Sequence, residues 1–351
     1  MMTSTAIKIS CKNLWKIYGP NQKLWFGQTN SEIEQNNVLE ELVSQEDHVG
    51  AVCNVSFDIL EGEIFVIMGL SGSGKSTIIR CLSRLIDPTA GEVFFEGKDL
   101  LKASASEMIE MRRHKMGMVF QNFGLMPHLN VLDNVAFPLR LQGMHRSERE
   151  KRARDIINLV GLEGREKSFP RELSGGQQQR VGIARSLAVE PQIWYLDEPF
   201  SSLDPLIRGQ MQEEFMRLQK LLNKTIVFIT HDFLEAIRLA DRIAIMKEGR
   251  VVQIGTPAEI VMKPANDYVA KFTKDVPRAK LIRAKDCMKI NQFPTATKDT
   301  FKVPADATLE EIIKKLSEKK QECSVLSSDG KIIGHISAET VIDALAEVDT
   351  K

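Results

Sequence analysis

The segment Gly69-Leu-Ser-Gly-Ser-Gly-Lys-Ser-Thr77 constrains the fold more than any other part of the chain. It fits the pattern G-x-x-x-x-G-K-[ST], follows the apolar run Ile64–Met68, and precedes a helical stretch that begins at Ile78. Glycines let backbone N–H groups turn inward around phosphate oxygens, and the N-terminus of the following helix attracts negative charge. The segment therefore predicts a phosphate-binding loop between a buried strand and a helix.

Within this loop, Lys75 supplies a mobile positive charge for the β- and γ-phosphates of a nucleotide. Ser76 offers a hydroxyl to Mg²⁺, which prefers hard oxygen ligands. The predicted nucleotide-binding residues of the loop are Gly69, Leu70, Ser71, Gly72, Ser73, Gly74, Lys75, Ser76 and Thr77.

Two further apolar runs end in chemically active residues: Ile193–Leu196 before Asp197, and Thr225–Thr230 before His231. Short apolar strands between helical stretches predict a largely parallel sheet, whose ligands gather at the carboxyl ends of the strands. We expect Asp197 to hold Mg²⁺, largely through water, and the next residue, Glu198, to orient or deprotonate an attacking water. His231 is expected to hydrogen-bond a γ-phosphate oxygen.

Gln121 ends another apolar run, Met118–Gln121, and its amide oxygen is predicted to reach Mg²⁺ or the attacking water. Taken singly, a glutamine or histidine at such a position is more often structural than functional. Their shared position at strand ends favours the functional interpretation.

A second glycine-rich turn, Leu173-Ser-Gly-Gly-Gln177, precedes an amphipathic helix that contains Val181, Ile183 and Leu187. Its amides also favour an anion, but one chain cannot easily fold this segment onto the far side of its own γ-phosphate. We therefore predict a two-fold dimer in which each Ser174 turn covers the nucleotide held by the other copy's Lys75.

Together these residues resemble the ABC-transporter ATPases over about residues 7–275. By position, the family's motifs fall on Gly69–Thr77 (Walker A), Gln121 (Q-loop), Leu173–Gln177 (signature), Ile193–Glu198 (Walker B), Ser201–Asp204 (D-loop) and His231 (switch histidine). The implied fold is an α/β P-loop NTPase of ABC type, with a mostly parallel sheet, an antiparallel β part and a helical subdomain at about 122–180.

The resemblance also implies roles for individual residues. Tyr18 occupies the position where the family stacks an aromatic ring on adenine; the alternative is a buried edge aromatic. Ser76, Gln121 and Asp197 are the implied Mg²⁺ ligands, and ATP is the implied nucleotide. The residues implied to contact ATP beyond the first loop are Tyr18, Ser174, Gly175, Gly176, Gln177 and Asp204.

A closer resemblance concerns the solute. Met68–Lys75, Phe123–His128 with Val131–Asn134, and Pro264–Val269 look like the glycine betaine/proline importer ATPases, which carry an insert where this chain has residues 21–50. The resemblance implies a subunit that hydrolyses ATP to energise uptake of a quaternary-amine osmolyte. It would act with membrane permease subunits and, indirectly, a solute-binding protein, at the cytoplasmic face of the inner membrane. The alternative is an importer of another methylated amine, such as trimethylamine N-oxide.

The chain's 351 residues suit one large domain and one small domain. We predict an ATPase domain at 1–277, a linker at 278–290 and a single CBS-like module at 291–351, expected to pair with its mate in the dimer. A capping box at Thr308–Glu311 and a turn at Ser327–Gly330 support that module. The insert 21–50 is acidic, with a possible short helix at Asn37–Val43, and is interpreted as a solvated excursion or a partner contact.

Composition excludes several other classes. The 47 basic and 47 acidic residues balance, so the whole chain shows no preference for nucleic acid. The five cysteines are scattered and predict neither a disulfide framework nor a zinc site. No secretory signal and no membrane-spanning apolar run is evident. Two other classes of ATPase-like protein are disfavoured by the motifs. A DNA-repair or chromosome ATPase would separate the two glycine turns with a long coiled coil, and no sustained heptads lie between them here. A non-hydrolytic regulator would not need Lys75, Glu198 and His231.

Overall fold

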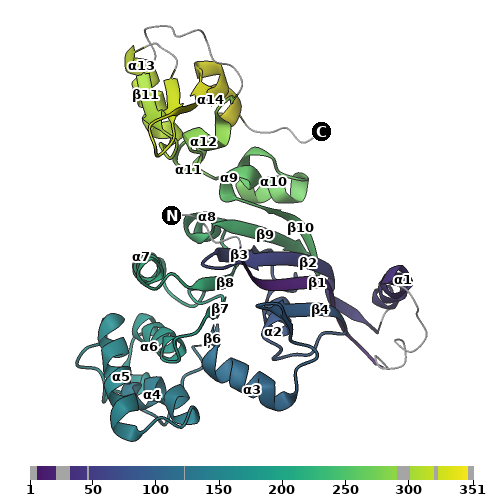
Figure 1. Ribbon diagram of the computed structural model, residues 1–351, viewed down its shortest axis with the longest axis vertical. Coiled ribbons are helices and arrows are strands. Elements are labelled where there is room, and N and C mark those ends of the chain that lie inside the picture. The colour runs from purple at the N-terminus through teal and green to yellow at the C-terminus, as the bar shows by residue number, and fades with distance from the viewer. Residues whose placement is uncertain are drawn as a thin grey trace. The chain divides into compact units, whose positions relative to one another are not determined.

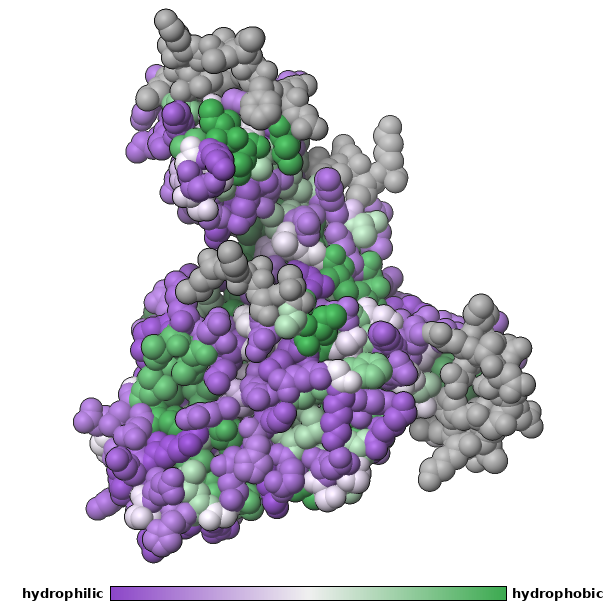
Figure 2. Space-filling model, viewed as in Figure 1, coloured by the Kyte–Doolittle hydropathy of each residue, from purple (hydrophilic) through white to green (hydrophobic). Residues whose placement is uncertain are grey.

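The computed structural model describes residues 6–20, 32–45, 47–121, 123–290, 301–319 and 323–346. The chain divides into two compact units (Figure 1). The first unit comprises residues 1–232 and 244–251, and the second comprises residues 233–243 and 252–351. Among the described residues, no helix is both long and apolar enough to cross a bilayer. The face shown in Figure 2 is mostly hydrophilic, with scattered hydrophobic patches.

The phosphate-loop strand lies in a six-stranded sheet with the order β10-β9-β3-β8-β7-β6. Neighbours pair in parallel from β3 to β6. Every residue of β3, β7 and β8 is buried, as expected for strands covered on both faces, so the three strands predicted from apolar runs are confirmed. The bounds are β3 Ile64–Met68, β6 Met116–Val119, β7 Ile193–Asp197, β8 Thr225–Thr230, β9 Arg242–Lys247 and β10 Arg250–Gly255.

The helices of the first unit connect these strands. Three of them, α4, α5 and α6, pack side by side as a helical group, in the region expected for the helical subdomain (Figure 1). Helix α6 begins within the second glycine turn, at Gly175, and not after the turn as predicted. The bounds are α2 Lys75–Leu82, α3 Ala105–His114, α4 Val131–Leu141, α5 Arg146–Leu159, the 3₁₀ turn η2 Pro170–Glu172, α6 Gly175–Leu187 and α7 Pro205–Leu222.

A four-stranded antiparallel sheet completes the first unit, in the order β2-β1-β4-β5. Its strands are β1 Ile7–Tyr18, β2 Val49–Leu60, β4 Ala90–Phe95 and β5 Lys98–Asp99. This is the antiparallel part that the family resemblance implied.

The acidic insert forms helix α1, Glu32–Val43, which is longer than the predicted 37–43. Its Leu39 and Leu42 are buried in a cluster with Trp15, and the Trp15 indole donates a hydrogen bond to Asn36 Oδ1 at 3.0 Å. Apolar packing therefore fixes α1 to β1, so this part of the insert is not a solvated excursion. Residues 21–31 and 46 lie outside the described residues.

The second unit contains short helices and a three-stranded sheet, β11-β12-β13, with one parallel and one antiparallel pairing. The Thr308–Glu311 capping box forms, and the hairpin around Ser327–Gly330 joins β12 to β13, both as predicted. The bounds are α8 Phe233–Leu239, α9 Pro257–Met262, α10 Asp267–Thr273, α11 Arg278–Leu281, α12 Ala284–Cys287, β11 Phe301–Pro304, α13 Leu309–Lys319, β12 Cys323–Leu326, β13 Ile332–Ile336 and α14 Ala338–Leu345.

Residues 278–290, predicted as a linker, contain two short helices in the structure. These are α11 and α12, and Ile282 and Ala284 are fully buried in the core of the C-terminal module. Met262 of α9 packs against the same core. A module of some sixty residues has little apolar surface to bury by itself, so it recruits these preceding residues. The limits of the domains remain a prediction.

Candidate nucleotide-binding and hydrolysis site

The loop between β3 and α2 depends on glycine at two tight points. Gly74, the residue before α2, has φ 97°, and a Cβ there would lie 2.0 Å from the Ala51 carbonyl oxygen. A Cβ on Gly69, φ 156°, would lie 2.3 Å from the Met246 carbonyl oxygen. Any side chain at either position would clash with backbone, so the close turn around the loop requires glycine.

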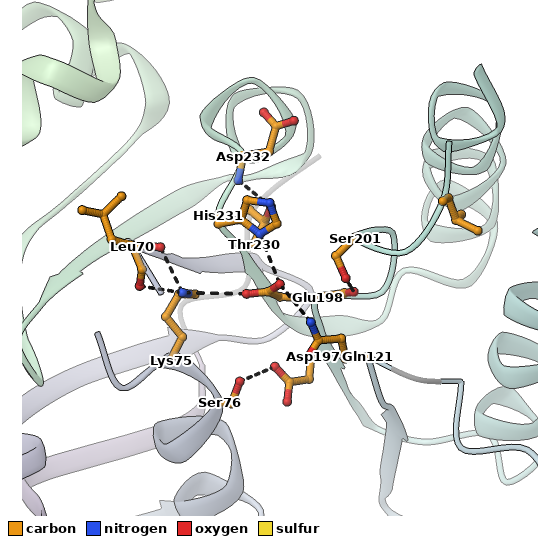
Figure 3. A network of polar contacts seen from close by, with 12 residues as sticks. Leu70, Lys75, Ser76, Gln121, Asp197, Glu198, Ser201, Thr230, His231 and Asp232 are labelled. Atoms are coloured by element: carbon orange, nitrogen blue, oxygen red, sulfur yellow. Dashed lines mark hydrogen bonds and ion pairs between the residues drawn. The ribbon is translucent and has the colours of Figure 1, made fainter. Parts of the chain in front are cut away.

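The charge of Lys75 lies inside this loop. The residue is 5% exposed, and its Nζ donates to the carbonyl oxygens of Gly69 at 2.9 Å and Leu70 at 3.0 Å (Figure 3). Burial lowers the pKa of the Lys75 ammonium, an effect that the nearby Glu198 and Asp197 carboxylates oppose. The ammonium is thus held by backbone carbonyls that a phosphate group could replace as partners.

The loop also contains an unused polar group. The Ser73 hydroxyl is buried and has no hydrogen-bond partner. A buried hydroxyl without a partner is costly, and an oxygen-rich anion in the loop would satisfy it. Together with Lys75, this makes the loop suitable for a phosphate chain.

Two oxygen groups face each other beside the loop. The Ser76 hydroxyl donates to Asp197 Oδ1 at 2.7 Å, and Asp197, at the end of β7, is only 2% exposed. Burial raises the pKa of the Asp197 carboxyl, while the Ser76 hydrogen bond and the Arg80 guanidinium, 3.8 Å away, oppose that rise. A hydroxyl and a carboxylate in contact are the oxygen ligands that Mg²⁺ accepts.

Glu198 lies at the centre of the polar network (Figure 3). Its Oε2 accepts a hydrogen bond from Gln121 Nε2 at 3.5 Å and lies 3.1 Å from His231 Nδ1, and its Oε1 lies 3.8 Å from Lys75 Nζ. Its backbone has φ 45°, a left-handed conformation that is uncommon for a non-glycine residue. Local strain of this kind often accompanies a functional position.

The network gathers six of the predicted site residues. They are Lys75 and Ser76 at the start of α2, and Gln121, Asp197, Glu198 and His231 at or just after the ends of β6, β7 and β8. The amide nitrogen of Gln121 faces the carboxylate of Glu198, and the predicted contact of its amide oxygen with Mg²⁺ or the attacking water stays a prediction.

Other predicted residues lie outside the network. Ser174 is exposed and caps α6: Gln177 N donates to its hydroxyl at 3.4 Å, and Ser174 N donates to Gln177 Oε1 at 3.0 Å. Asp204 caps α7 in the same way, accepting from Ile207 N at 3.1 Å. Within the described part of the chain, no hydrogen bond or ion pair of these side chains reaches the Lys75 loop.

Tyr18 ends β1 with 40% of its surface exposed, so the alternative of a buried edge aromatic does not hold. The Lys16 ammonium lies 5.1 Å from the centre of its ring. The exposed ring is available for stacking.

Two residues that contribute to the site were not predicted from the sequence. Arg80 approaches Asp197, and Ser201 Oγ donates to the Glu198 carbonyl oxygen at 3.0 Å, which supports the left-handed backbone. Arg80 lies four residues after Ser76 on α2, so helical spacing would have placed both on one face. Ser201 was named only as part of a motif.

Comparison with known proteins shows the family of the chain. Residues 52–201 match the family model described as "ABC transporter", and residues 290–347 match that of the CBS domain. The chain is 49% identical to the trimethylamine N-oxide transport system ATP-binding protein TmoW of Pelagibacter ubique, over 98% of both chains. It is 46% identical to the glycine betaine/proline betaine transport system ATP-binding protein ProV of Escherichia coli, over 97% of this chain and 84% of that protein.

A solved structure gives the same result for the fold. The dimeric post-hydrolysis state of the ATP-binding cassette MJ0796, bound to ADP and Pi, aligns with a TM-score of 0.59 and 34% identity, covering 71% of this chain and 98% of that one. The chain therefore belongs to the ABC-transporter ATPases, the ATP-binding subunits that couple hydrolysis to transport, and it carries a C-terminal CBS domain.

Proposed function

We propose that this chain is the ATP-hydrolysing subunit of an importer for a quaternary-amine or related osmolyte of the glycine betaine, choline or proline class, or for trimethylamine N-oxide. The observation that carries the hydrolytic part is the position of Glu198. Its carboxylate lies among Lys75, Gln121 and His231, next to a loop built for phosphates. The solute class is supported by the named relatives.

Each residue of the site has its own role in binding or hydrolysis. Lys75 and Ser73 bind the phosphate chain, and Tyr18 stacks on the base. Ser76 and Asp197 hold Mg²⁺, which supplies neutralisation of the charge that develops on the phosphates. Glu198 takes the proton of the attacking water, while Gln121 and His231 hold that water and the carboxylate in line.

The second glycine turn acts across a dimer. The exposed Ser174–Gln177 turn at the start of α6 covers the γ-phosphate bound by the Lys75 loop of a second copy, and Asp204 lies near the same interface. The similarity to a dimeric cassette supports this arrangement. ATP closes the dimer, and hydrolysis reopens it.

This cycle drives partners in the membrane. The region between Gln121 and Leu173, which contains α4 and α5, would dock on cytoplasmic helices of the permease subunits, so the chain would lie peripherally at the inner membrane. A solute-binding protein would act on it indirectly through the permease. The CBS domain would pair with the same domain of the second copy.

Trimethylamine N-oxide is a specific second candidate for the solute. The chain spans 98% of the length of TmoW but 84% of the length of ProV, although the identities, 49% and 46%, are close. Both alignments cover nearly all of this chain, so the difference lies in the part of ProV that this chain does not match. This favours the trimethylamine N-oxide system over the glycine betaine/proline betaine system.

The test is ATP hydrolysis by the full complex of this chain, its permease and its solute-binding protein in liposomes. Glycine betaine, choline, proline and trimethylamine N-oxide are added singly, and the same complex with Glu198→Gln sets the background. Stimulation by one of these solutes supports the proposal and identifies the cargo. Hydrolysis that responds to none of them would refute the solute class, and absence of hydrolysis above the background would refute the ATPase.

A further inference from the structure

The backbone that follows Gln121 has an unusual conformation. Phe123 and Gly124 are both left-handed, with φ 58° and φ 59°. Glycine adopts this conformation freely, but for a bulky aromatic residue it is strained. Other contacts must therefore hold the chain in this shape, only two residues after the glutamine that faces Glu198.

Those contacts come from Arg185 on α6. Its Nη1 donates to the Gly124 carbonyl oxygen at 2.5 Å, and its Nη2 donates to the Phe123 carbonyl oxygen at 3.2 Å. Burial lowers the pKa of the Arg185 guanidinium, which nevertheless stays charged because arginine is so basic. The planar fork of a guanidinium matches two successive carbonyl groups, which a single ammonium cannot do.

Close packing makes this contact possible. Gly182, one turn earlier on α6, lies so close that an added Cβ would be 3.3 Å from the Phe123 carbonyl oxygen. The far end of the segment is fixed as well: the buried Asn134 side chain accepts from Met126 N at 2.9 Å and donates to the Leu129 carbonyl oxygen at 2.9 Å. Residues 123–129 are thus fastened at both ends to the helical group.

We propose that Arg185 is a positioning residue for Gln121. By fastening residues 123 and 124 to α6, it holds the Gln121 amide against Glu198. Because α6 begins at the second glycine turn, the same helix joins that turn to the hydrolytic carboxylate: a displacement of α6 moves Gln121. The positioning role rests on the proposed function of Glu198. The hydrogen bonds from Arg185 to residues 123 and 124 do not depend on that function and can be tested separately.

The same helix offers a matched control. Arg180 makes a similar tether, with its Nη1 donating to the carbonyl oxygens of Val160 at 3.3 Å and Gly161 at 3.5 Å. These acceptors follow α5 and are not part of the Glu198 network. Loss of the Arg180 hydrogen bonds should lower the stability of the helical group by a similar amount without displacing Gln121.

The experiment compares Arg185→Lys with Arg180→Lys in the full-length chain, with melting temperature as the measure of folding. Amide hydrogen exchange of the peptide covering Phe120–Met126 should rise about tenfold in Arg185→Lys only, because the charged hydrogen bonds to that backbone are lost. If Arg185→Lys does not fold, Arg185→Gln, which keeps one planar donor, takes its place. Unchanged exchange in this peptide, or an equal rise in Arg180→Lys, would overturn the tether.

Kinetics then test the positioning role. Arg185→Lys should lower kcat for ATP about tenfold with KM unchanged, and it should lower kcat no further in a Gln121→Ala background, because both changes remove one effect. If the reductions in kcat of the two single variants add in the double variant, Arg185 does not act through Gln121. The exchange measurement needs no hydrolysis, so a chain that does not hydrolyse ATP at all would refute the proposed function and leave the tether still tested.

Discussion

The two glycine-rich turns of this chain are similar in sequence and very different in surroundings. Each combines serine and glycine at the start of a helix: Gly74 directly precedes α2, and Gly175 and Gly176 are the first two residues of α6. At the first turn, Ser73 and Lys75 are buried, and the carboxylates of Asp197 and Glu198 lie beside them. At the second, Ser174 is exposed and its hydroxyl caps its own helix.

This difference shows what a local motif can and cannot specify. Both turns present helix N-terminal amides, so both attract anions. Only the first is surrounded by a lysine, a hydroxyl and two carboxylates of its own chain. The second turn becomes a part of a catalytic site only if another molecule supplies the rest, and the following experiments test that division.

The largest effect is expected at the first turn. Glu198→Gln should slow hydrolysis roughly 10²–10⁴-fold, because the general base is lost, while ATP binding remains. It should also trap an ATP-dependent dimer, visible by gel filtration. Glu213→Gln, an exposed change on α7, serves as the control. A variant that binds ATP but stays monomeric would contradict the shared site.

Binding to the isolated chain should separate the two turns. Lys75→Ala should weaken ATP affinity about 10–10²-fold, since it removes charged hydrogen bonds to phosphates. Ser174→Arg should leave the affinity of the monomeric chain unchanged. Titration calorimetry at low protein concentration measures both. Equal losses would mean that the second turn contacts the nucleotide of its own chain.

Mixing Lys75→Ala with Ser174→Arg tests the sharing directly, because a dimer of either variant alone lacks one part of both shared sites and should hydrolyse little ATP. A dimer of one Lys75→Ala chain and one Ser174→Arg chain contains one intact Lys75 loop facing one intact Ser174 turn. An equal mixture should therefore recover about a quarter of wild-type hydrolysis if the chains exchange freely and the sites act independently. A mixture as inactive as its components would show that each chain needs both turns intact in itself.

A smaller effect concerns the buried charge at the first turn. Because burial raises the pKa of Asp197, the folded chain binds this proton more tightly than the unfolded chain. Its contribution to stability therefore falls as pH rises from about 4 to the raised pKa and stays constant above it. Asp197→Asn should thus melt at the same temperature or a few degrees (~1 kcal/mol) higher at pH 7, and lose the extra stability given by Mg²⁺ and ATP.

Thermal melts across pH, with and without Mg²⁺-ATP, measure this effect. Asp204→Asn is the matched control, because asparagine caps a helix as well as aspartate does and the site is exposed. A lower melting temperature for nucleotide-free Asp197→Asn at pH 7 would show that the carboxylate stabilises the fold.

The smallest effect is expected from the C-terminal module, which contributes to neither turn. Deleting residues 291–351 should leave basal hydrolysis and ATP affinity unchanged. It should, however, expose Ile282 and Ala284, which are buried in the core of the module. A deletion that starts at 278 removes these residues and should aggregate less, as light scattering would show. Loss of ATP binding in either truncation would refute the division into domains.

The sequence predicted the local structure well, because its signals were local. Continuous apolar runs marked the buried strands β3, β7 and β8, and the pattern of glycines with Lys75 marked the loop before α2. The Thr308–Glu311 capping box needed only residues three apart. In each case the deciding interactions lie within a few residues along the chain.

Tertiary structure decided which of these residues meet. The order of the strands and the parallel register, with Met68 beside Thr230 and Asp197 beside Ile229, bring Gln121 and His231 to Glu198. The same holds for α1 on Trp15 and for Ile282 in the C-terminal core. The tether from Arg185 to Phe123 and Gly124 likewise has no local signal, because its partners are about sixty residues apart. Such pairs are chosen by packing of the whole fold, and a short stretch of sequence does not record them.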